Sequence, residues 1–126
     1  MSVAPDPCVL IVEDDPDIRL LFSTTLAVRG FAVRTAGHGA EALAALESGP
    51  RPAVIVADLH MPVMDGWELL TALHATPAFS SIPVIVLTAA DDPGRSAPRP
   101  ATILIKPVAT ETLIEAIEAT IAGRAA

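Results

Sequence analysis

The sequence predicts a doubly wound α/β protein, and three observations support that fold class. Continuously apolar, β-branched runs recur along the chain, as in parallel strands that are covered on both faces. Segments of helical period with recognisable ends lie between these runs. The length of 126 residues fits one domain. Strand–helix alternation of this kind implies a parallel sheet with right-handed crossovers.

Four runs are strong strand candidates, and a fifth is weaker. The strong runs share a continuous apolar character: Cys8–Val12, Ala53–Ala57, Val84–Leu87 and Thr102–Ile105. The weaker run is Phe31–Thr35. We therefore expect five strands, of which the four strong ones are buried on both faces.

The first helix has a clear beginning and end. Asp15 is a predicted N-cap followed by proline at the first helical position, and Gly30 closes the helix. The spacing predicts a buried stripe made of Ile18, Leu21, Phe22 and Leu26.

Three further helices are expected over Gly39–Ser48, Gly66–Ala75 and Thr110–Ala122. Asp65 is the predicted N-cap of the second of these. In the last helix, Leu113, Ile114, Ile117 and Ile121 are predicted to face inward, and Glu111, Glu115 and Glu118 are predicted to face solvent.

The segment 89–101 interrupts the alternation where the next crossover helix should lie. It contains three prolines and a glycine, and proline removes helix donors and disfavours helical backbone at the residue before it. We expect a loop with at most one helical turn near Ala89–Asp92, so that the fourth helix of the fold is shortened or missing.

Composition excludes several classes of function. A net charge of −7 with a single lysine, Lys106, argues against direct binding to DNA or to an anionic membrane. The one cysteine, Cys8, excludes an internal disulfide framework and a cysteine-cluster metal site. No apolar run approaches the roughly 20 residues of a membrane-spanning helix, and no signal peptide opens the chain. We therefore expect a soluble, cytoplasmic protein.

Polar residues stand at the carboxyl ends of the four strong strands. They are Glu13 with Asp14, Asp58, Thr88 and Lys106. Ligands of open parallel sheets bind beyond these ends. Each residue alone is also explained as a cap, a turn residue or a surface side chain. Their joint placement predicts a functional site, whereas the three histidines lack metal-ligand spacing and are assigned to the surface or to loops.

The charges indicate what such a site would bind. Two carboxylates about 4 Å apart repel each other by roughly 4 kcal/mol at an effective dielectric constant near 20. Three clustered carboxylates therefore require a cation or a bound proton. Oxygen ligands without a nearby His or Cys set favour Mg²⁺ over zinc. With Mg²⁺ and Lys106 the site is nearly neutral, so it can accept a phosphoryl group, and a carboxylate can be the acceptor.

From about Val9 to Ile121 the chain resembles the receiver domain of bacterial two-component response regulators. The resemblance rests on four blocks in order: IVEDDPDIR, VIVADLHMPVMDGWELL, PVIVLTAADD and ILIKPV. It implies a flavodoxin-like, five-stranded sheet of order 2-1-3-4-5. We expect a stand-alone receiver over residues 8–122, with a lead-in at 1–7, a tail at 123–126 and no output domain.

The resemblance also implies a role for each site residue. Asp58 would be the phosphoacceptor, and Thr88 and Lys106 would bind phosphoryl oxygens, with a cis peptide between Lys106 and Pro107. The Mg²⁺ ligands would be Glu13, Asp14, Asp58 and the backbone carbonyl of His60.

The implied phosphoryl donor is a sensor histidine kinase or a histidine phosphotransfer protein. The downstream partner is an unknown protein, and the expected state is a monomer or weak dimer. The protein would not be a conventional enzyme, although it would take part in Mg²⁺-dependent phosphotransfer to its own aspartate and in its own dephosphorylation.

Two departures from the family pattern concern output. The proline-rich 89–101 segment lies where receivers normally carry their fourth helix, and Ile103 stands where many receivers have Tyr or Phe. We hypothesise that output uses another face, or that the domain is a phosphate relay or sink.

Two alternatives to the receiver function are a phosphorylation-independent interaction scaffold and an aspartyl-phosphate hydrolase. The hydrolase would usually need an acid two residues after the nucleophile, where this chain has His60.

Overall fold

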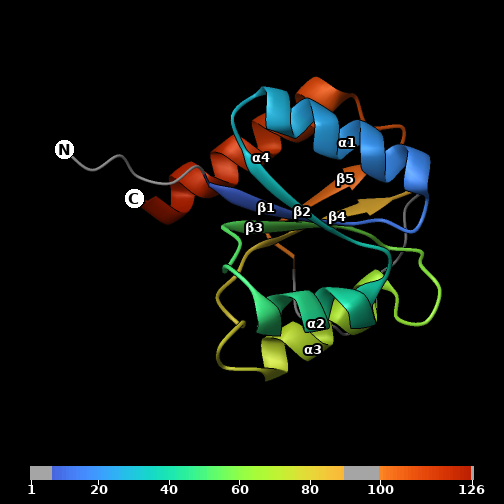
Figure 1. Cartoon of the computed structure of the whole chain (residues 1–126), viewed down its shortest axis with the longest axis vertical. Coiled ribbons are helices and arrows are strands. Elements are labelled where there is room, and N and C mark those ends of the chain that lie inside the picture. Colours follow the sequence, from blue (N-terminus) through green and yellow to red (C-terminus); the bar gives the residue numbers. More distant parts are fainter. Residues whose placement is uncertain (1–6, 90–99, 126) are drawn as a thin grey trace.

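A five-stranded parallel sheet forms the centre of the molecule, with helices on both faces (Figure 1). The computed structural model describes residues 7–89 and 100–125. The strand order is β2-β1-β3-β4-β5, which confirms the predicted fold class and strand order. In chain order the elements are β1 (Cys8–Val12), α1 (Pro16–Val28), β2 (Ala32–Ala36), α2 (Gly39–Ser48), β3 (Val54–Asp58), α3 (Gly66–Ala75), β4 (Val84–Thr88), β5 (Thr102–Ile105) and α4 (Thr110–Ala125).

The sheet separates two hydrophobic clusters. Helices α1 and α4 cover one face, and α2 and α3 cover the other (Figure 1). Leu10 and Ile11 are neighbours in β1 and point to opposite faces, so Leu10 joins the α2/α3 cluster and Ile11 joins the α1/α4 cluster. Both are fully buried. Burial on both faces is the reason that β1 has a continuous apolar sequence.

The buried stripe of α1 is narrower than predicted. Phe22 and Leu26 are buried and Ile18 packs against them, whereas Leu21 is 55% exposed, so its predicted burial is wrong. Ile18, Phe22 and Leu26 are each four residues apart and form one line along the helix. Leu21 lies off that line on the solvent side. The predicted cap is confirmed, since the Asp15 side chain accepts the backbone N–H groups of Asp17 and Ile18.

The strand ends differ slightly from the prediction. β3 and β4 each end one residue later than expected, at Asp58 and Thr88. Both polar residues are therefore the last residues of their strands, where hydrogen bonds between strands fix the backbone. The Leu59 N–H donates to the Leu87 carbonyl at 2.8 Å, and the Lys106 N–H donates to the Thr88 carbonyl at 2.7 Å.

The predicted burial of the last strand on both faces is wrong. Leu104 packs into the α1/α4 cluster, but Ile103 and Ile105 are 50% and 55% exposed. β5 is an edge strand, and within the described residues its side chains are partly buried on one face and exposed on the other. The prediction of a shortened or missing helix between β4 and β5 falls mostly on residues 90–99, which lie outside the described part.

Helix α4 runs three residues farther than predicted, to Ala125. Gly123 does not end it, since one glycine in a helix costs only about 1 kcal/mol. Its predicted faces are confirmed: Leu113, Ile114 and Ile117 are buried, Ile121 is partly buried, and the three glutamates are exposed.

Helix α3 carries the only tryptophan of the chain, Trp67. Its side chain is buried in the α2/α3 cluster, and its indole Nε1 has no hydrogen-bond partner among the described residues.

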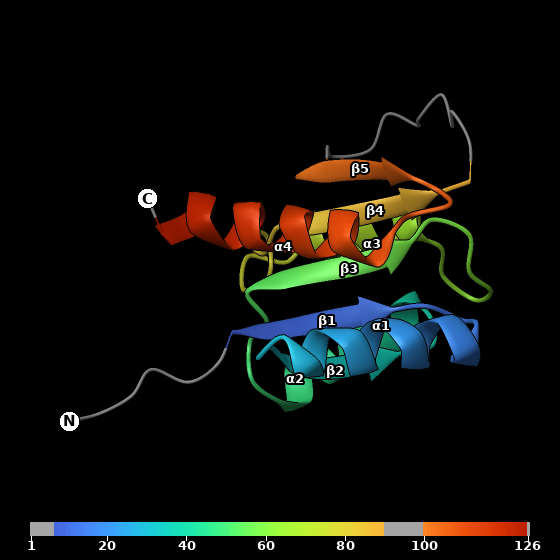
Figure 2. The same ribbon diagram turned by 90° about the horizontal axis from the view of Figure 1, so that it is seen from above.

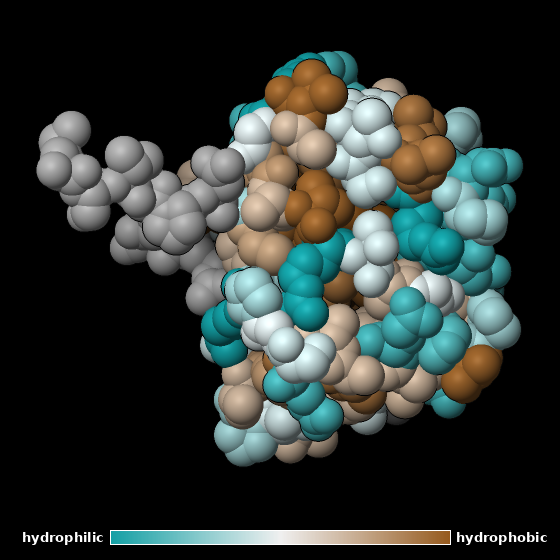
Figure 3. All heavy atoms as spheres, in the orientation of Figure 1, coloured by the Kyte–Doolittle hydropathy of each residue, from teal (hydrophilic) through white to brown (hydrophobic). Residues whose placement is uncertain are grey.

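The surface has apolar side chains between polar ones. Figure 3 shows hydrophobic residues next to hydrophilic ones over the face that it presents. The exposed large apolar residues of the described part are Leu20, Leu21, Val28, Val63, Ile103 and Ile105. Within the described residues, no helix combines the length and the apolar character that crossing a membrane requires.

Candidate functional site

The predicted site residues meet at one edge of the sheet. All five strands are parallel, so their carboxyl ends point the same way (Figure 2). Glu13 and Asp14 follow β1, Asp58 and Thr88 end β3 and β4, and Lys106 follows β5.

Three carboxylates form a cluster at this edge. One oxygen from each of Glu13, Asp14 and Asp58 lies within 4.8 Å of the other two. Glu13 and Asp58 are 2% and 4% exposed, whereas Asp14 is exposed. Two acids are therefore held in a poorly hydrated position, and the third faces solvent. Such a set needs a countercharge or a bound proton.

Glu13 is the member of the cluster in which the environment favours the protonated carboxyl group. Burial, together with the adjacent Asp58 carboxylate, raises the pKa of Glu13 to about 8, although the Asp15 backbone N–H and the Lys106 ammonium oppose the shift. Its Oε2 atom is buried and has no hydrogen-bond partner among the described residues. Buried oxygen without a partner is rare in proteins. An all-oxygen cluster with an unpartnered buried atom fits a hard divalent cation such as Mg²⁺.

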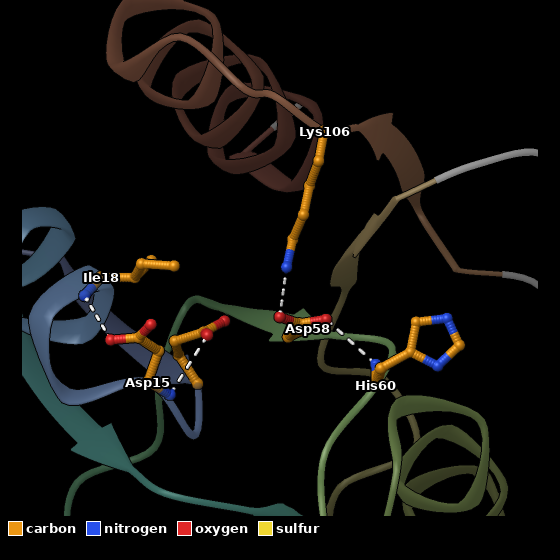
Figure 4. A network of polar contacts seen from close by, with 6 residues as sticks. Asp15, Ile18, Asp58, His60 and Lys106 are labelled. Carbon is orange, nitrogen blue, oxygen red and sulfur yellow. Dashed lines mark hydrogen bonds and ion pairs between the residues drawn. The ribbon is translucent and has the colours of Figure 1, made fainter.

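Asp58 accepts hydrogen bonds at both carboxylate oxygens (Figure 4). The Lys106 ammonium donates to Oδ2, and the backbone N–H of His60 donates to Oδ1 at 3.0 Å. Lys106 extends from the end of β5 to reach Asp58, and the His60 ring points away from that carboxylate. The imidazole ring therefore does not face the Asp58 carboxylate.

Thr88 and Lys106 are joined through the backbone. The Lys106 N–H donates to the Thr88 carbonyl, and the Thr88 side chain is buried at the end of β4. The peptide between Lys106 and Pro107 is cis, which confirms that prediction. The structure thus brings together Glu13, Asp14, Asp58, Thr88 and Lys106 at the strand ends.

The start of α3 fixes the segment that follows Asp58. Asp65 and Glu68 form a capping box, which confirms the predicted cap. The Gly66 N–H donates to the Leu59 carbonyl at 2.9 Å. A Cβ atom on Gly66 would lie 2.9 Å from the Asp58 carbonyl oxygen, so only glycine permits this approach of the helix to the strand end.

The sequence did not reveal the roles of two side chains, of which one contacts the site. Arg19 donates from Nη1 to the backbone carbonyl of Glu13 at 2.8 Å. Helical side chains lean toward the N-terminus of their helix, so an arginine at the end of the first turn is able to reach the preceding strand end. His38, assigned to the surface or a loop, caps α2, since its Nδ1 accepts the Glu41 N–H at 3.2 Å.

Comparison with known proteins identifies the class. The model of the response regulator receiver domain family matches residues 9–118. A probable chemotaxis protein CheY of Rhizobium etli is 37% identical over 124 residues, which cover 94% of this chain and 95% of that protein. The solved structure of the chemotaxis response regulator CheY4 of Vibrio cholerae is 33% identical, covers 91% of this chain and 98% of its own, and has a TM-score of 0.80.

A third relative is larger. The transcriptional regulatory protein PrrA of Mycobacterium tuberculosis is 45% identical over 83 residues, which cover 66% of this chain and 34% of that protein. The chain thus spans about a third of the length of PrrA. The chain belongs to the response regulator receiver domain family, and it is a receiver domain of two-component signalling.

Proposed function

We propose that Asp58 accepts a phosphoryl group from a phosphohistidine donor in the presence of Mg²⁺. The observation that carries this proposal is the convergence of Glu13, Asp14 and Asp58, with Lys106 donating to the same aspartate. The proposed cation ligands are these three carboxylates and the backbone carbonyl of His60. Membership of the receiver family supports the assignment.

In the transfer, an oxygen of the Asp58 carboxylate attacks phosphorus and a P–O bond forms. The P–N bond to the donor imidazole breaks, and the departing imidazole takes a proton from solvent. Held by these residues, Mg²⁺ would supply positive charge against the carboxylates and the phosphoryl oxygens. Phosphoryl transfer depends mainly on such positioning and charge stabilisation, which is the chemistry that this cluster offers.

Lys106 and Thr88 bind the phosphoryl oxygens in this proposal. The Lys106 ammonium already contacts Asp58, and its flexible stem lets it follow an oxygen that moves outward. A compact ammonium suits one oxygen better than a wide guanidinium does. The Thr88 hydroxyl, at the end of the neighbouring strand, donates to a second oxygen.

Phosphorylation changes the charge of the Asp58 side chain from −1 to about −2. Drawing Lys106 and Thr88 toward the new oxygens changes the surface at the strand ends, and the binding of a downstream protein changes with it. The proposed donor is a sensor histidine kinase or a histidine phosphotransfer protein.

The test uses a small-molecule phosphoryl donor, such as acetyl phosphate, and intact-mass measurement. With Mg²⁺ we expect the mass to increase by one phosphoryl group, and we expect no gain with chelator or in Asp58→Asn. Asp17→Asn is the matched control, because Asp17 is an exposed acid of α1 that is not one of the three clustered carboxylates. A gain that persists in Asp58→Asn would refute the assignment. No gain in the wild type would favour the phosphorylation-independent scaffold.

A further inference from the structure

The side chain of Arg19 contacts the backbone at Glu13, in the acidic pair Glu13–Asp14 that follows β1. Arg19, in α1, is partly buried, and its Nη1 donates to the carbonyl oxygen of Glu13 at 2.8 Å. This hydrogen bond is charge-assisted, and such bonds are stronger than neutral ones. Arg19 therefore binds the peptide group that joins Glu13 to Asp14, and it forms no ion pair with either carboxylate.

The backbone of Glu13 is held on both sides. Its N–H donates to the Ala36 carbonyl at 3.0 Å, and its carbonyl accepts from Arg19. Asp14 differs, because its side chain is exposed and has no hydrogen-bond partner among the described residues. The direction of the Asp14 carboxylate consequently depends on the peptide plane that Arg19 holds.

The Arg19 guanidinium lies close to Gly37, in the loop between β2 and α2. A Cβ atom on Gly37 would lie 3.4 Å from Arg19 Nη1 and 3.6 Å from Glu41 Oε2. The guanidinium thus lies beside this loop, and glycine at position 37 leaves room for it.

We propose that Arg19 is a positioning residue for Mg²⁺ binding, which it supports by holding the Glu13–Asp14 peptide group. The inference rests on the proposed function. The direction of the change in Mg²⁺ affinity distinguishes this role from a purely electrostatic one. A positive charge near a Mg²⁺ site repels the metal, so if Arg19 acted only through its charge, removing it would tighten Mg²⁺ binding. Removing a positioning Arg19 weakens it.

The experiment measures the Mg²⁺ affinity of the full chain by calorimetry at fixed pH and ionic strength. In Arg19→Gln and Arg19→Met the dissociation constant rises about tenfold, the lower end of the effect of outer-sphere substitutions. Arg19→Lys keeps the charge and one donor and binds with an affinity between the wild type and Arg19→Gln. Arg34→Met is the control, since Arg34 also donates to backbone carbonyls, those of Ala45 and Pro50, away from the cluster.

A second readout needs no metal. In the metal-free protein, NMR shows a shift of the Asp14 amide nitrogen in Arg19→Gln and none in Arg34→Met, because that nitrogen shares a peptide group with the Glu13 carbonyl. Mg²⁺ binding in Arg19→Gln and Arg19→Met that is equal to or tighter than in the wild type would overturn the positioning role of Arg19 and leave the proposed function standing. Absence of Mg²⁺ binding by the wild type would overturn the proposed function as well. If Arg19→Met does not fold, Arg19→Gln and Arg19→Lys decide the outcome.

Discussion

Lys106 donates a hydrogen bond to Asp58 across 48 residues of sequence, and this ion pair joins the end of β5 to the end of β3. The two side chains differ in burial, since Lys106 is about one-third exposed and Asp58 is almost fully buried. The pair is therefore asymmetric: Lys106 is able to turn toward solvent, and Asp58 is not.

That asymmetry predicts the effect of Lys106→Met. Without the ammonium, the buried Asp58 carboxylate faces Glu13 with no countercharge, and we expect the free energy of unfolding in chelator to fall by about 2 kcal/mol. Urea denaturation measures the change. Mg²⁺ reduces the loss, because the divalent cation replaces the missing charge.

A double-mutant cycle provides the control for this prediction. In Asp58→Asn, Lys106→Met removes no ion pair, so its cost is smaller than in the wild type. Equal costs in both backgrounds would show that the ion pair does not stabilise the fold.

Glu13 predicts a pH dependence of stability in the metal-free protein. Its pKa in the folded chain is raised to about 8, mainly by burial, so the folded state binds more protons than the unfolded state at intermediate pH. The stability that Glu13 contributes is full below the unfolded-chain value of about 4.3 and is lost as the pH rises through about 8. Thermal denaturation in chelator at a series of pH values should show this loss of stability as the pH rises.

Glu13→Gln isolates this effect from the titration of the histidines. The variant lacks the carboxyl proton, and its stability falls less between about pH 5 and pH 8 than that of the wild type. Asp17→Asn, which changes an exposed acid, keeps the wild-type slope. Identical slopes in the wild type and Glu13→Gln would contradict the prediction.

Gly66 and Gly123 provide a matched pair of helical glycines. A Cβ at Gly66 would meet backbone atoms of Asp58 and Leu59 at 2.9 Å, whereas a Cβ at Gly123 would meet nothing within 4 Å. Gly66→Ala should therefore destabilise the fold by about 1–3 kcal/mol. Gly123→Ala should stabilise it by up to about 1 kcal/mol through helix propensity. Thermal denaturation of both variants tests the contrast, and a neutral Gly66→Ala would refute it.

Val63 predicts a stabilising substitution. It has φ 66°, the left-handed region that a β-branched residue rarely adopts, and it is 77% exposed. Val63→Asn, a residue that tolerates this conformation, should raise the free energy of unfolding by about 1 kcal/mol. Val28 is also exposed but lies in a helix, and Val28→Asn should not raise the free energy of unfolding. Equal effects of the two substitutions would argue against backbone strain at Val63.

The sequence allowed the sheet and most helix boundaries to be predicted, because burial on both faces and capping leave local signals. α2 and α3 have the predicted bounds, and the strand-end residues meet as expected. Leu21 and Ile103 show where the local signal fails. Whether an apolar residue is buried depends on the element packed against it, and a single chain segment does not reveal that element.

Arg19 illustrates a different limit. Its acceptor is a backbone carbonyl, a group that every residue carries, so no side-chain pattern marks the contact. The opposite exposures of the neighbouring acids Glu13 and Asp14 are equally invisible in the sequence, since both have the same charge. They follow from the direction in which the chain leaves β1.

Trp67 gives the protein a built-in optical probe. The chain has one tryptophan and no tyrosine, so fluorescence excited at the red edge of the protein absorption band comes from one indole. Trp67 follows Gly66 in the chain, and the Gly66 N–H donates to the carbonyl of Leu59, the residue after Asp58. A change in the emission of this indole therefore reports on the junction between the acidic strand end and α3, without any attached dye.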